Sequence, residues 1–99
     1  MARLTIIYWR DIPAQVTVKN GGTVRRPLTP RFQEAIDEAA MRAGAQESSD
    51  YAKGFERRDQ GEVEGEPDAV ALTSAQRLEA EYDDVRLRTL SRNGGHEEG

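Results

Sequence analysis

The residues best suited to recognition chemistry lie near the start of the sequence, where the apolar run from Leu4 ends in Trp9, Arg10 and Asp11. An indole offers a broad apolar surface and a guanidinium offers a planar set of donors, and both are enriched at the centres of protein interfaces. We therefore predict a partner-binding site at Tyr8, Trp9, Arg10 and Asp11. The alternative is structural, with Trp9 in the core and Arg10 and Asp11 pairing locally or capping a turn.

A second group of candidates consists of arginines. Arg25 and Arg26 precede Pro27, and Arg57 and Arg58 follow later in the chain. Guanidinium groups bind carboxylates and phosphates through paired hydrogen bonds, so we add Arg25 and Arg26 to the partner-binding set. The alternative is an edge strand whose charges prevent aggregation. A bound phosphate cofactor is not expected, because Asn20-Gly21-Gly22 is not followed by a helix as a phosphate loop would be.

Catalytic and metal-binding residues are not expected. The chain has no cysteine, and its single histidine, His96, lies in the segment Asn93–Gly99. Thiolate chemistry is therefore excluded, and histidine-based acid–base catalysis is disfavoured. Alternating carboxylates from Glu62 to Asp68 do not match a calcium-binding loop, so a solvated acidic loop is the interpretation we adopt there.

Length and charge favour one small domain, which we place at residues 1–92, with a disordered tail at 93–99. The net charge is −4; residues 1–45 hold seven Lys/Arg and four Asp/Glu, whereas residues 46–99 hold seven and fourteen. The acidic excess argues against nucleic acid as a partner. Neither a membrane-spanning run nor a signal-like segment is visible in the sequence, so we expect no membrane partner and a cytoplasmic location.

The first part of the chain is typical of β-structure. Residues 3–9 are apolar on both alternating faces, which predicts a central strand. Pro13 is expected to interrupt pairing. Residues 15–19 alternate, with Val16 and Val18 facing inward, and a hairpin turn at 20–22 leads to a third strand at 23–26 that Pro27 places at an edge.

Helices are expected in two places. Thr29, Pro30 and Gly44 bound the first, and Pro67 opens the second, which ends at Asp83. Between them, residues 51–58 are predicted to form a fourth strand, with Gly54 at a bulge or a close backbone approach. Residues 85–90 are assigned to a short helix or a turn. The predicted fold class is α+β, a mainly antiparallel sheet of three to four strands with two main helices on one face.

The segments RLTIIYWRDIPAQVTV and LTPRFQEAIDEAAMRAG, together with RLEAEYDDVRLRTL, resemble the virulence-factor domain family of small bacterial proteins. The resemblance extends over roughly residues 3–92, and YWRDIPAQV is its most specific part. It singles out Tyr8, Trp9, Arg10, Asp11, Ile12, Pro13 and Gln15. It carries no established catalytic residues. In this family, stand-alone members often lie near genes of one-carbon and methyl-transfer metabolism. The resemblance therefore implies an accessory subunit of such an enzyme.

Together these features favour a non-enzymatic binding or accessory module whose partner is another protein. One alternative is an accessory subunit or enzyme of methyl transfer, which predicts a pocket beside Arg10 with Arg26 or Arg57 converging there. A second alternative is a homodimer formed through an exposed strand edge.

Overall fold

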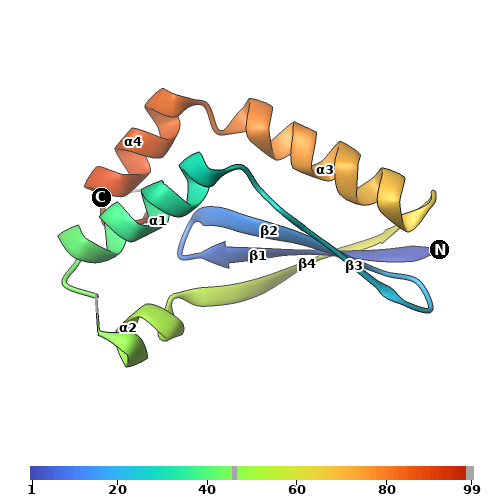
Figure 1. Ribbon diagram of the computed structural model, residues 1–99, viewed down its shortest axis with the longest axis horizontal. Coiled ribbons are helices and arrows are strands. Elements are labelled where there is room, and N and C mark those ends of the chain that lie inside the picture. Colours follow the sequence, from blue (N-terminus) through green and yellow to red (C-terminus); the bar gives the residue numbers. More distant parts are fainter. Residues whose placement is uncertain (46, 98–99) are drawn as a thin grey trace.

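The computed structural model describes residues 1–45 and 47–97, and its centre is a four-stranded antiparallel sheet (Figure 1). The strands are β1 (Ala2–Trp9), β2 (Ile12–Lys19), β3 (Thr23–Pro27) and β4 (Phe55–Val63), in the order β3-β2-β1-β4. The predicted central position of the first strand is confirmed. β3 and β4 form the two edges of the sheet.

The predicted hairpin of β2 and β3 is present, and Val18 lies opposite Val24 and Lys19 opposite Thr23. Val16 and Val18 are fully buried, as the alternation indicates. The expected interruption at Pro13 is wrong. β2 begins at Ile12, and Pro13 pairs with Tyr8 across a shift in register between Ile7 and Tyr8. A β-bulge accommodates the extra residue without ending the ladder.

The region before β4 differs from the prediction. Residues 51–53, assigned to a strand from their alternation, belong to a short helix, α2 (Ser48–Lys53). β4 then runs from Phe55 to Val63, through part of the segment interpreted as an acidic loop. Parity alone cannot distinguish one helical turn from a short strand. Pairing with β1 decides the outcome for β4, because the sequence of β4 is mostly polar and has no apolar alternation of its own.

Three main helices lie on one side of the sheet: α1 (Pro30–Arg42), α3 (Pro67–Glu81) and α4 (Asp84–Arg92) (Figure 1). α1 and α3 are the predicted two and pack on the strands, whereas α4 packs mainly on α1. The additional one is α4, in the region assigned to a short helix or turn. The Asp83 side chain accepts a hydrogen bond from the Arg86 N–H and caps α4. The expected break after Tyr82 is therefore the start of a new helix. None of the described helices is long and apolar enough to cross a bilayer.

The core lies between these helices and the inner face of the sheet. Leu4, Ile6 and Val16 from the strands meet Phe32 and Ile36 from α1, and all are nearly inaccessible to solvent. α3 contributes the predicted stripe of Ala71, Ala75, Leu78 and the adjoining Tyr82. This layer fixes the sheet, and the sheet in turn fixes the β1–β2 turn at one end.

Glu79 lies near the end of α3 and links it to the start of α1. Its carboxylate accepts hydrogen bonds from the Thr29 N–H (2.8 Å) and hydroxyl (2.9 Å) and pairs with Arg31 at 2.9 Å. Burial alone raises the pKa of Glu79, but these hydrogen bonds outweigh it, and the pKa lies below its ordinary value. Thr29, predicted as a helix cap, makes no capping bond within α1 and binds Glu79 instead.

Replacing Glu79 with alanine is expected to destabilise the domain by about 1–3 kcal/mol, because it removes charge-assisted hydrogen bonds at a partly buried position. Urea unfolding monitored by Trp9 fluorescence measures the change. The matched variant Glu81→Ala, two residues along α3 and exposed, should stay within about 0.5 kcal/mol of wild type. Equal stability of the two variants would contradict this role for Glu79.

Candidate binding pocket at the β1–β2 turn

Arg10 and Asp11 form a two-residue turn between the paired residues Trp9 and Ile12. Arg10 has φ = 55° and is the one described non-glycine residue with a positive φ. Glycine or asparagine occupies this conformation at little penalty, whereas a side chain such as arginine is strained there by about 1–2 kcal/mol. The surrounding contacts must therefore hold Arg10 in place.

Trp9 is the residue on which these contacts converge. It is completely buried, and its indole Nε1–H donates to the Tyr51 carbonyl of α2 at 2.7 Å. A Cβ atom on Gly54 would lie 2.4 Å from the indole Nε1, and one on Gly95 would lie 2.9 Å from Cζ3. Both glycines thus allow backbone to approach the ring. The close approach predicted for Gly54 is present, and Trp9 fills the core rather than an exposed surface.

Arg10 points away from Asp11. Its guanidinium lies 4.7 Å from the centre of the Trp9 ring and donates to the Gly94 carbonyl at 2.7 Å. Its backbone N–H donates to the Gly54 carbonyl at 2.8 Å. Arg10 therefore contacts both the segment that enters β4 and the segment that follows α4. Its charge is half-buried at this junction.

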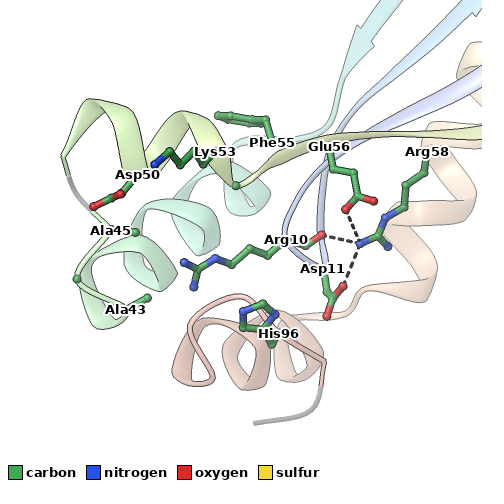
Figure 2. A pocket seen from close by; sticks show the side chains of 12 residues that line it. Arg10, Asp11, Ala43, Ala45, Asp50, Lys53, Phe55, Glu56, Arg58 and His96 are labelled. Carbon is green, nitrogen blue, oxygen red and sulfur yellow. Dashed lines mark hydrogen bonds and ion pairs between the residues drawn. The ribbon is translucent and has the colours of Figure 1, made fainter.

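Asp11 pairs with Arg58 of β4 at 3.0 Å, and Arg58 also donates to the Arg10 carbonyl at 2.8 Å (Figure 2). The second carboxylate oxygen of Asp11 accepts the backbone N–H of Glu97 at 2.7 Å. That hydrogen bond, followed by those from Arg58, holds the pKa of the Asp11 carboxyl below its ordinary value, against the opposing effect of burial. Asp11 is consequently ionised at neutral pH and fixed on both sides.

The segment after α4 completes the site. Residues 93–99 were expected to be a disordered tail, but residues 93–97 fold back on the turn, and residues 98–99 lie outside the described chain. Gly94 and Gly95 are buried, and the Gly95 carbonyl accepts the Asp11 N–H at 2.8 Å. Glu97 pairs with Arg86. Glycine-rich composition predicts flexibility, but here it permits close packing on Trp9.

A hollow of about 690 Å³ opens beside this turn (Figure 2). The turn and β4 form one wall, the end of α1 and α2 form a second, and His96 lies on the remaining side. Its charged lining residues are Arg10, Asp11, Asp50, Lys53, Glu56 and Arg58. Lys53 makes no hydrogen bond or ion pair within residues 1–45 and 47–97, so its ammonium group is available to a ligand.

The other predicted site residues lie elsewhere. Tyr8 is buried on the inner face, where the Arg58 guanidinium lies 4.1 Å from its ring centre. Arg25 and Arg26 lie on edge strand β3 and do not line the hollow. A pocket does adjoin Arg10, as the enzyme alternative predicts, but Arg58 converges there and neither Arg26 nor Arg57 does.

Sequence reasoning did not select Lys53, Asp50 or Glu56. They are isolated charges in a polar segment, and only the packing of α2 and β4 around Trp9 brings them to the turn. Arg58 was noticed only as one of two adjacent arginines. The alternation of a strand places Arg57 and Arg58 on opposite faces, and the register with Ile6 directs Arg58 to the inner one. Among the described residues, no three or more His, Cys, Asp or Glu side chains are grouped to hold a metal ion.

These features define a small α+β domain, a four-stranded antiparallel sheet under three helices with a charged hollow at one end. The family model described as "Virulence factor" matches residues 7–90, and the chain belongs to that family. The match confirms the resemblance found in the sequence. Searches of curated proteins and of solved structures gave no match.

The ion pair at the turn predicts a specific pH dependence. Because the pKa of Asp11 is lower in the folded state, its contribution to stability is present above the unfolded value of about 3.9 and is lost as pH falls through the folded value. Wild type should exceed Asp11→Asn by about 1 kcal/mol at pH 6. This difference in unfolding free energy should shrink below pH 4. A difference independent of pH would show that the charge of Asp11 does not matter.

The close approach at Trp9 predicts that Gly54→Ala destabilises the domain by about 2–3 kcal/mol, because the new methyl group would overlap the indole. Thermal or urea unfolding measures the loss. Gly22→Ala serves as the control, since a Cβ there meets no heavy atom within 4 Å and φ is not positive. Similar stability of both variants would refute the sandwich of Trp9 between glycines.

Proposed function

We propose that this virulence factor family domain is a binding or accessory module that engages another protein through the hollow beside Arg10. The observation that carries the proposal is the Arg10 turn itself. A strained backbone position that favours glycine instead bears an arginine, and its guanidinium lines the hollow. Strained positions of this kind concentrate at functional sites.

The charges of the hollow indicate what the partner offers. Arg58 pairs with both Asp11 and Glu56, whereas the side chains of Lys53 and Asp50 have no partner in the described chain. Arg10 uses one guanidinium nitrogen on Gly94 and retains further donors. The groups left open to a partner therefore include two cations, Lys53 and Arg10, beside the one unpaired carboxylate among the described lining residues, that of Asp50. An acidic side chain of the partner would satisfy both, and charge-assisted pairs of this kind are strong and directional.

The fold supports binding because three of the segments that line the hollow are anchored on Trp9. The turn follows it directly, α2 accepts its N–H, and Gly95 packs on its ring. Such a preformed site loses little conformational freedom when a partner arrives. The stack on the buried Trp9 ring also holds the Arg10 guanidinium in place where it lines the hollow.

The test compares the tagged full chain with two variants as baits in lysate of the bacterium that encodes it. Lys53→Glu reverses an exposed charge without breaking a contact and should reduce recovery of a specific partner at least fivefold. Arg10→Gly should do the same. Its stability should change by less than about 1 kcal/mol, because relief of backbone strain offsets the lost bond to Gly94.

Lys19→Glu is the matched control. Lys19 is also an exposed, unpaired lysine within the described residues, but it lies at the end of β2 and does not line the hollow. It should leave partner recovery unchanged. If folded Lys53→Glu and Arg10→Gly both retain every protein recovered with wild type, the hollow is not the binding site.

A further inference from the structure

The free edge of β3 forms a second surface, separate from the hollow beside Arg10. β3 pairs with β2 on one side, and within residues 1–45 and 47–97 no strand pairs with its other side. An unpaired edge exposes N–H and C=O groups that can hydrogen bond an added strand. What such an edge binds depends on which groups face outward and what lies beside them.

The hydrogen bonds of β3 determine which groups face outward. The Leu28 N–H donates to the Ala14 carbonyl at 3.2 Å, so Leu28 directs its backbone toward β2. Antiparallel ladders alternate, and Arg26 and Val24 therefore also face β2. Thr23 and Arg25 direct their N–H and C=O away from the sheet. Pro27, which has no N–H, falls in the outward set, where it breaks no bond of the ladder.

A groove of about 510 Å³ adjoins this edge on the helical side. Arg26, Pro27 and Thr29 line it from the strand side, and α3 contributes Leu72, Ala75, Gln76, Glu79 and Ala80. The Glu79 carboxylate is already bonded to Thr29 and Arg31. The Leu72 side chain is 40% exposed and is therefore accessible to a ligand in the groove. The groove lies where one face of a fifth strand would direct its side chains, so it provides an apolar site for alternate residues.

Charge determines which strand can occupy the edge. Arg25 and Arg26 are exposed and make no hydrogen bond or ion pair in the described part of the chain. A second copy pairing through β3 would bring four arginines together, which disfavours a symmetric dimer at this edge. An acidic strand would meet complementary charge on both faces. The same arginines therefore oppose self-association and favour an acidic partner.

The opposite edge lacks these properties. β4 is interrupted by a register shift against β1 between Leu4 and Thr5. Near this point Gly61 has φ = 89°, and its N–H is already bound by the Asp59 side chain at 2.8 Å. Bulges and bonded N–H groups make an edge a poor template for an added strand. β3 is regular over all five of its paired residues.

We propose that β3 and the α3 groove bind an extended acidic segment of another protein, which adds to the sheet as a fifth strand. Its apolar side chains would lie against Leu72, and its carboxylates would pair with Arg25 and Arg26. This site shares no lining residue with the hollow beside Arg10. It would allow the domain to hold a second part of the same partner or a different protein.

The experiment titrates the ¹⁵N-labelled full chain with the capped peptide acetyl-EEVEVEE-amide at 150 mM salt and follows backbone amide shifts. In an extended strand this sequence places valines and glutamates on one face and glutamates on the other. Shifts are expected at Thr23 and Arg25 and along α3 near Leu72. The double variant Arg25→Glu/Arg26→Glu should weaken binding at least tenfold. Arg57→Glu/Arg88→Glu carries the same change in net charge at exposed, unpaired residues outside the groove and should bind within twofold of wild type.

Two control peptides separate strand addition from charge attraction. The same sequence N-methylated at its second and third residues keeps its charge. Because consecutive N–H groups of a strand point to opposite sides, it loses one N–H on the side that faces β3 in either orientation, and it should not bind. Acetyl-KKVKVKK-amide should not bind either. Equal binding of the methylated peptide, shifts confined to β4 or the Arg10 hollow, no binding at millimolar peptide, or self-association of the chain through β3 would each overturn the proposal.

Discussion

The burial of Trp9 is the constraint on which the candidate site depends. Its indole is enclosed by backbone at Gly54 and Gly95 and gives its N–H to Tyr51. Three distant segments are thereby fixed against one ring: α2, the turn of Arg10 and the segment after α4. A buried indole needs a hydrogen-bond acceptor, and the end of α2 supplies it. The hollow is the space that remains between these segments, so its shape follows from the packing of one side chain.

The sheet offers two separate candidate binding surfaces, the hollow at the β1–β2 turn and the free edge of β3. Its three main helices lie on one side only (Figure 1). One end of the sheet holds the turn, where opposite charges are already paired around Arg58. One edge holds β3, where cations are left unpaired beside an apolar groove. Both surfaces offer donors to acidic groups although the chain as a whole carries a charge of −4. The distribution of charge, rather than its total, is what indicates the partner chemistry.

Local sequence was a sound guide where local interactions decide structure. The hairpin, the start of α1 at Pro30 and the stripe of α3 were all predicted, because turn chemistry and periodicity act over a few residues. Predictions failed where strand pairing decided the outcome. Pro13 was expected to end the ladder, but opposite Tyr8 it lies at a bulge. α2 was mistaken for a strand, because six residues are too few for periodicity to discriminate.

The sequence by itself determined the family and the α+β class. These depend on residue types in consecutive order. Only the tertiary structure decided that Trp9 is internal, that Asp11 pairs with Arg58 instead of Arg10, and that Lys53 and His96 share a recess with them. Those contacts join residues more than forty positions apart. Local preferences carry no information about contacts between residues so far apart in the sequence. The register of β1 with β4 and the packing of other segments around the Trp9 indole determine these contacts.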